Sequence, residues 1–68
     1  MGRLILSRRC GEEIVLDTSD GLVVVQVARI SDGRVRLAVM APAEVPVHRR
    51  HVFDAIHPGR LASEMEAA

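Results

Sequence analysis

Residues 22–39 read LVVVQVARISDGRVRLAV, and this stretch predicts the β-hairpin around which the rest of the chain is arranged. Its first half is rich in valines, which favour strands because β-branched side chains are stiff at χ1. The central Asp32-Gly33 pair favours a two-residue turn, in which both positions take positive φ. Beyond the turn, apolar residues alternate with arginines over residues 34–39, which indicates a strand with one buried and one wet face.

Shorter apolar runs on either side of this hairpin predict three more strands, at residues 4–8, 12–16 and 45–48. A cluster of turn-forming residues at 17–21 separates the second strand from the hairpin. Pro46 confines the last strand to a sheet edge, because proline cannot donate a hydrogen bond to a neighbouring strand. Five short strands per chain are therefore expected.

The C-terminal part of the chain predicts one short helix. Val52, Phe53 and Ile56 fall on one helical stripe, and Pro58-Gly59 ends it. We expect an all-β fold with a C-terminal α-helix at about 49–57. The β domain with this helix would span residues 1–57, and residues 58–68 would form a mobile or weakly helical tail.

Chain length favours an oligomer. A chain of 68 residues buries only about 60% of its unfolded surface on folding and is marginal alone. Disulfides cannot compensate, because Cys10 is the only cysteine. The single cysteine, together with the lack of a secretory leader and of a membrane-length apolar run, predicts a cytoplasmic protein without a membrane partner.

The basic residues of the chain are all arginine, and they are balanced by acidic residues to a net charge of zero. Arginine presents a planar fork of donors that suits phosphates and guanine edges, although genome base composition could also explain its use. Phe53 is the only aromatic residue, so stacking platforms for bases are missing. Any RNA contact should therefore use backbone groups and arginines.

Catalytic and metal sites are not predicted. Cys10 lacks a recognisable base, and no pair of carboxylates is placed for acid–base work. His48, His51 and His57 do not share one helical face and have no partnering Cys or carboxylate motif. We expect neither an enzyme nor a cofactor.

Two arginine segments near the chain ends remain as candidates. Residues 4–9 end in Arg8-Arg9, and residues 45–50 end in Arg49-Arg50. If an oligomer brought them together, one basic edge would result. Its backbone groups could read bases while the arginines hold phosphates.

Two blocks of the sequence point to a known family. Residues 4–9 read LILSRR, with Gly11-Glu12 just after, and residues 34–39 read RVRLAV, leading to Ala41-Pro42 and to EVPVHR at 44–49. Together they closely resemble the carbon storage regulator (CsrA/RsmA) family of bacterial translational regulators. The match runs from about Leu4 to Ile56 and is highly specific.

The resemblance implies an interleaved homodimer, in which the first strand of one subunit pairs with the last strand of the other. Each of two equivalent edges would bind a GGA-containing hairpin loop in an mRNA leader near the ribosome-binding site. Binding would repress initiation or alter mRNA stability. Small decoy RNAs with GGA elements would titrate the protein, a flagellar assembly factor could antagonise it, and no DNA partner is implied.

Carried over by position, the resemblance makes Arg49 the principal RNA-contacting side chain. The first strand of the partner would contribute further contacts through Leu6, Ser7, Arg8 and Arg9. Val47 and His48 would flank Arg49 on its own strand. For Leu6 and Val47, packing of the strand edge is the alternative interpretation.

Departures from the family pattern leave a second hypothesis open. Met40 stands where Asn is common, Ala43 where Lys is common, and Pro46 removes a backbone donor. These changes fit a dimeric protein-interaction module with a weakened RNA edge, controlled by a protein partner. In addition, residues 17–21 exceed the usual second turn of the family, which predicts an enlarged surface loop.

Overall fold

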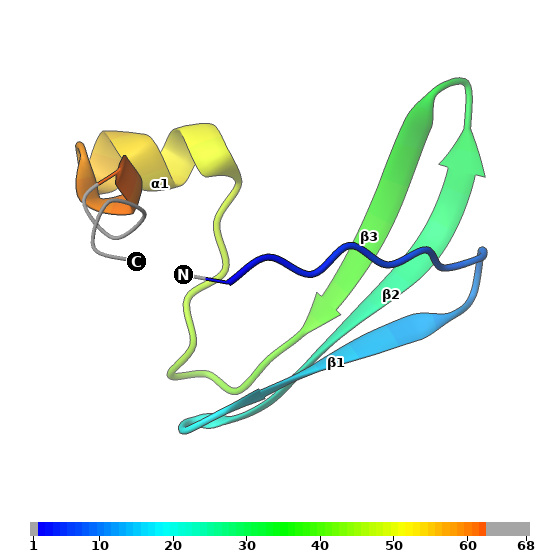
Figure 1. The fold of residues 1–68 in the computed structure, drawn as a ribbon, viewed down its shortest axis with the longest axis horizontal. Helices are drawn as coiled ribbons and strands as arrows, with labels where there is room; N and C mark the ends of the chain where they lie inside the picture. The colour runs from blue at the N-terminus through cyan, green and yellow to red at the C-terminus, as the bar shows by residue number, and fades with distance from the viewer. Residues whose placement is uncertain (1, 63–68) are drawn as a thin grey trace.

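A computed structural model describes residues 2–62 of the chain, where three strands form one antiparallel sheet that leads into a short helix (Figure 1). The sheet order is β1-β2-β3. The elements are β1 (Glu13–Thr18), β2 (Gly21–Ser31), β3 (Arg34–Met40) and α1 (Arg50–Ile56). The predicted β-rich fold with a helix near the C-terminus is confirmed.

The β2–β3 hairpin has the predicted turn. Asp32 and Gly33 have φ values of 51° and 71°, and Ser31 pairs with Arg34 across them. Both central positions therefore take the positive φ that this tight turn requires.

The β1–β2 connection differs from the enlarged loop that the sequence predicts. Thr18 pairs with Gly21, so only Ser19 and Asp20 form the turn. The Thr18 hydroxyl donates to the Gly21 carbonyl at 2.6 Å and accepts from the Asp20 amide at 3.3 Å. Because this hydroxyl satisfies the turn's backbone groups, the strands continue to the turn and the loop prediction is wrong.

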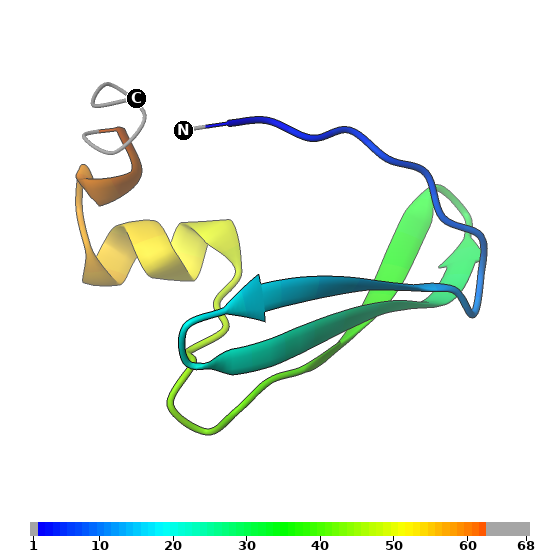
Figure 2. The ribbon, with the colours of Figure 1, turned by 60° about the horizontal axis from the view of Figure 1, so that its bottom comes forward.

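One face of the sheet is apolar and poorly covered. The strand register places most of the apolar residues of the three strands on a single face, which we call the apolar face: Ile14, Leu16, Val23, Val25, Val27, Ile30, Val35, Leu37 and Val39. Val15, Leu22, Val24 and Met40 lie on the opposite face. Among the described residues only Val23 is buried, whereas Leu37 is 57% exposed. Residues 2–9 and α1 lie on this side without sealing it (Figure 2). A single chain therefore lacks a closed core.

In the part of the chain that the structure describes, the two outer segments predicted as strands, residues 4–8 and 45–48, do not pair with the sheet, and the Val45 amide instead donates to the Pro42 carbonyl at 3.0 Å in a turn. A strand needs a neighbour to satisfy its backbone groups. The five-stranded arrangement therefore stays a prediction that requires a second chain.

The C-terminal part of the prediction is tested only up to residue 62. α1 lies within the predicted helix, and residues 60–62 are helical, while the rest of the predicted tail lies outside the described residues. No helix in the described part of the chain is long and apolar enough to cross a membrane.

Candidate functional site

A tight turn fixes the backbone that follows the first arginine segment. The Glu12 amide donates to the Arg9 carbonyl at 3.0 Å, and Gly11 within the turn has a φ of 88°, which glycine adopts without strain. The Gly11 amide donates to the Val27 carbonyl at 2.7 Å, and the Val27 amide donates to the Glu12 carbonyl at 3.0 Å. The arginines are thereby anchored to β2.

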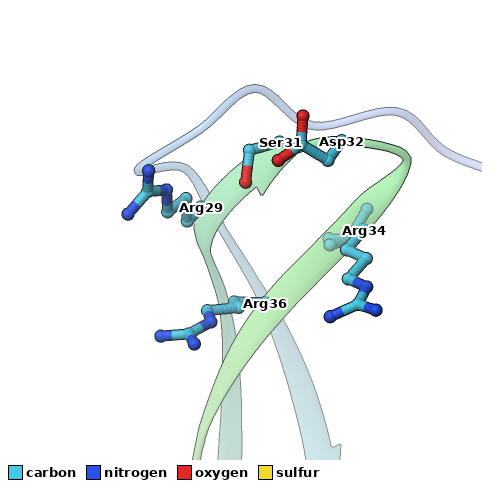
Figure 3. A pocket seen from close by; sticks show the side chains of 6 residues that line it. Arg29, Ser31, Asp32, Arg34 and Arg36 are labelled. Atoms are coloured by element: carbon cyan, nitrogen blue, oxygen red, sulfur yellow. The ribbon is translucent and has the colours of Figure 1, made fainter.

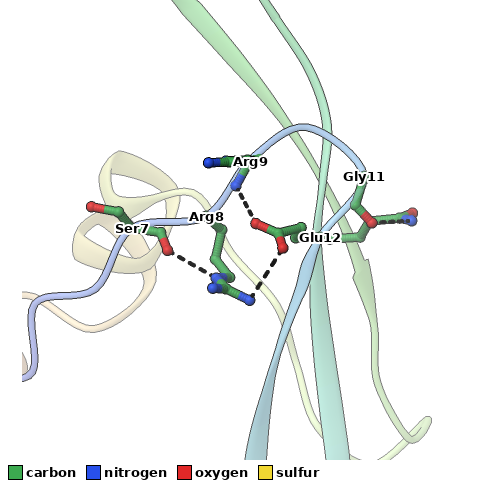
Figure 4. A network of polar contacts seen from close by, with 6 residues as sticks. Ser7, Arg8, Arg9, Gly11 and Glu12 are labelled. Carbon is green, nitrogen blue, oxygen red and sulfur yellow. Dashed lines mark hydrogen bonds and ion pairs between the residues drawn. The ribbon is translucent and has the colours of Figure 1, made fainter.

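The Glu12 carboxylate holds both arginines that precede this turn (Figure 4). One oxygen accepts from the Arg9 amide at 2.8 Å, and the other lies 3.7 Å from Arg8 Nη1. The Arg8 Nε also donates to the Ser7 carbonyl at 2.8 Å. In the single chain, the Arg8 side chain is therefore engaged by its own neighbours, although it is still 44% exposed.

Arg49 stands at the junction between the second segment and α1. Its backbone is extended, with φ −64° and ψ 150°, and its side chain makes no capping hydrogen bond. Within residues 2–62 the exposed guanidinium has no hydrogen bond or ion pair. The neighbouring Arg50, in contrast, donates to Asp54 Oδ2 at 2.9 Å. Arg49 is therefore available to a ligand in a way that Arg50 is not.

Phe53 ties the second segment to the helix. Its ring lies 6.4 Å from the His48 ring and 5.0 Å from the His57 ring, both tilted by 48°. The Arg60 guanidinium lies 5.7 Å from the same ring centroid, within the range of cation–π attraction. Such ring pairs stabilise by about 0.5–1.5 kcal/mol. The residue just before Arg49 is thus placed beside α1 by this ring pair.

The two arginine segments line different hollows. Leu6 and Arg8 line a hollow over the apolar face. Val47, His48 and Arg49 line a second one beside β3, together with Ala28, Val35, Arg36, Leu37 and Val39; we call it the edge hollow. Within residues 2–62 no hydrogen bond or ion pair joins the two segments.

Exposure of the other candidate residues fits a surface role. Leu6 is 47% exposed and Val47 54%, and Ser7 and Arg9 are also exposed. The sequence analysis assigned no role to Glu12, although a glutamate four positions after an arginine can indicate an ion pair between the two side chains. Among the described residues, no three His, Cys, Asp or Glu side chains gather to hold a metal ion.

Comparisons with known proteins agree on one family. The model of the CsrA global regulator protein family matches residues 3–58. A translational regulator CsrA of Rhodopirellula baltica is 47% identical over 64 residues, which cover 94% of this chain and 87% of that protein. A translational regulator CsrA of Desulfitobacterium hafniense strain Y51 is 40% identical over 65 residues, covering 96% and 75%. No solved structure gives a significant match.

Proposed function

The chain belongs to the CsrA family of global regulators, and from this premise we propose that it is an RNA-binding translational regulator that acts as a homodimer in the cytoplasm. Its ligands are GGA-containing hairpin loops in mRNA leaders near the ribosome-binding site, where binding represses initiation or alters mRNA stability. Decoy RNAs with the same element compete for it. The observation that carries the proposal is the exposed Arg49 guanidinium, which has no partner among residues 2–62, beside a sheet edge that pairs with no strand of that same range.

The uncovered apolar face supports the dimer. Leu37 on this face is 57% exposed, and Leu4 and Ile5, which line a hollow with it, are 82% and 77% exposed. A contiguous exposed apolar surface of this kind marks an interaction site. The outer edge of β3 pairs with no other strand of the described residues, and an exposed edge strand is a template for another chain. A second copy of this chain satisfies both requirements.

The edge hollow suggests where the second copy sits. It has a volume of about 740 Å³ and lies between β3 and the segment that carries Arg49. Residues 4–9 begin with the apolar Leu4-Ile5-Leu6 and pair with no strand in the described part of the chain, so the same segment of the partner suits this slot. The partner's Arg8 would then approach Arg49, and the two arginine segments would form one site.

The chemistry of that site favours readout by backbone groups. Phe53 is the only aromatic residue, and it is occupied by two histidines and Arg60. Bases bound at the edge would therefore meet amide and carbonyl groups of the two segments, while the arginines hold phosphates. Leu6, Ser7, Arg9, Val47 and His48 are the remaining residues proposed to contact RNA or to shape the edge.

The test is an RNA titration with neighbouring arginines as a matched pair. Arg49→Ala should weaken binding to a GGA hairpin by about 10- to 100-fold, because charge-assisted hydrogen bonds contribute about 1.5–3 kcal/mol. Arg50→Ala removes the same charge one residue away, where the guanidinium is already paired, and should change affinity little. Equal affinity of the wild type and the folded, dimeric Arg49→Ala variant would contradict the proposal.

A dimeric protein-interaction module remains the second candidate. Pro46 places a residue without an amide proton in the middle of the proposed RNA edge, which favours weakened base readout and control by a protein partner such as a flagellar assembly factor. Sequencing of RNA that copurifies with the protein separates the two functions. Enrichment of GGA-containing leaders supports the regulator, and recovery of protein partners without RNA supports the module.

A further inference from the structure

We propose that Arg29, Arg34 and Arg36 on the β2–β3 hairpin form a second phosphate-binding patch, which holds the RNA backbone that flanks the element bound at the arginine edge. The inference rests on the proposed RNA-binding function and extends its footprint. We call these three residues the hairpin patch.

A bulge in β2 creates the patch. Val27 pairs with Leu37, but the next pair is Arg29 with Arg36, so Ala28 is an extra residue in the ladder. In a regular strand, Arg29 would share the face of Val27, because side chains alternate with a period of two. The extra residue instead moves Arg29 to the opposite, polar face and places it directly across from Arg36.

The contacts of the bulge hold it in place. The Ala28 carbonyl accepts from Cys10 Sγ at 3.5 Å, and the Val27 carbonyl accepts from the Gly11 amide at 2.7 Å. The turn that anchors Arg8 and Arg9 therefore also braces the point where β2 changes face. This links the geometry of the patch to that of the first arginine segment.

Within residues 2–62, no ion pair compensates the charges of the three arginines of the patch. Like charges directly across a strand pair are destabilising, and Arg34 follows on the same face, paired with Ser31. The ion pairs recorded within residues 2–62 involve Glu12 and Asp54, and neither reaches the hairpin. Asp32 in the turn is the one acidic residue that lines the same hollow. An external anion would relieve the repulsion between the arginines.

The shape of the patch suits a polymer backbone. Figure 3 shows Arg29 and Arg36 extending toward the same side of the hairpin, with Arg34 set apart from them. The hollow that they line, together with Ser31, Asp32 and Val35, is open and has a volume of about 700 Å³. Arginines spread along an open surface match phosphates spaced along a strand, whereas a single small anion would engage only part of the patch.

Continuity with the edge hollow identifies the anion as RNA. Val35 and Arg36 line both the hairpin hollow and the edge hollow, and the latter also contains Arg49. An RNA held at Arg49 can therefore continue across Arg36 to Arg29 and Arg34. Since phosphate contacts carry no sequence information, the patch should add affinity and salt dependence without changing base preference.

The experiment compares two RNAs and two variants. One RNA is a minimal GGA hairpin, and the other carries the same hairpin with a single-stranded extension on each side. The test variant is Arg29→Gln/Arg34→Gln, which spares Arg49 and the residues of the proposed edge. The control is Ala55→Glu/Ala62→Glu, which lowers the net charge by the same two units on exposed positions beyond the hairpin.

Affinity is measured by fluorescence anisotropy over a salt series. For the extended RNA, the test variant should lower the slope of log K against log salt by about 1.4, because each single-strand phosphate contact contributes about 0.7. Between 50 and 200 mM salt this corresponds to about a sevenfold smaller loss of affinity. Binding of the minimal hairpin should be unchanged, and the control variant should keep the full slope.

The outcomes are distinguishable. A test variant that binds the extended RNA with the wild-type slope overturns the hairpin patch and leaves the proposed function standing. An equal change of slope in both variants assigns the effect to net charge and also overturns the patch. Failure of the wild-type protein to bind either RNA overturns the proposed function and the inference with it.

Discussion

Gly21→Ala should be one of the most damaging single-methyl changes in the chain. Gly21 has a φ of 124°, and a Cβ at this position would lie 2.9 Å from Pro42 Cγ. The backbone strain costs about 1–3 kcal/mol, and overpacking against the proline ring costs about 1–3 kcal/mol more. Since about 1 kcal/mol shifts the melting temperature of a domain this small by about 4–8 °C, a loss of roughly 10 °C or more is expected.

Gly33→Ala provides the matched control. Gly33 also has positive φ, 71°, but a Cβ there would meet nothing within 4 Å. This variant should lose only the backbone contribution, about 1–2 kcal/mol. The difference between the two variants therefore measures the contact with Pro42.

A double-mutant cycle tests the contact directly. Pro42→Ala removes Cγ and leaves a Cβ whose distance from an alanine at position 21 is 3.9 Å, an ordinary van der Waals contact. In the Gly21→Ala background it should restore about 1–3 kcal/mol. Melting is followed by circular dichroism at one fixed protein concentration, because the stability of the proposed dimer would depend on that concentration. Equal losses in Gly21→Ala and Gly33→Ala, with no rescue by Pro42→Ala, would refute the reasoning.

Two further predictions concern the proposed edge and the dimer. Glu12→Gln removes the ion pair with Arg8 but keeps an acceptor for the Arg9 amide. RNA affinity in a titration should therefore rise modestly, while the free energy of unfolding changes by less than about 1 kcal/mol. Weaker RNA binding would contradict the view that Glu12 competes with RNA for Arg8. Leu37→Asp places a charge on the apolar face and should convert the proposed dimer to a monomer in light scattering. Leu22→Asp, whose side chain is similarly exposed at 58% but lies on the opposite face, should leave that dimer intact.

Local features of the fold are predictable from the sequence. Asp32-Gly33 specifies the hairpin turn because few other residue pairs accept two positive φ values. The alternation in residues 34–39 assigns the faces of β3, and the apolar stripe that includes Phe53 predicts α1. Each of these signals lies within a few residues of the structure it specifies.

Features that depend on distant contacts are not predictable in this way. β2 is apolar at four of its first five positions, so its sequence does not reveal the face of each residue, and the bulge that turns Arg29 toward Arg36 cannot be inferred. The short β1–β2 turn depends on the Thr18 hydroxyl. For the candidate site, exposure of Arg8 and Arg49 follows from sequence, but their approach requires a partner strand that a single chain does not contain.

The uncovered apolar face has a consequence for how the protein responds to its own abundance. Because the sheet of one chain retains a single buried hydrophobic residue among those described, folding and assembly would be one concentration-dependent event. At low concentration the chains would remain unfolded, and proteases and chaperones would act on them, so that the amount of protein would fall further. Regulation of mRNA would then switch on steeply with gene dosage, as a threshold in synthesis rate, before any RNA decoy or protein antagonist acts.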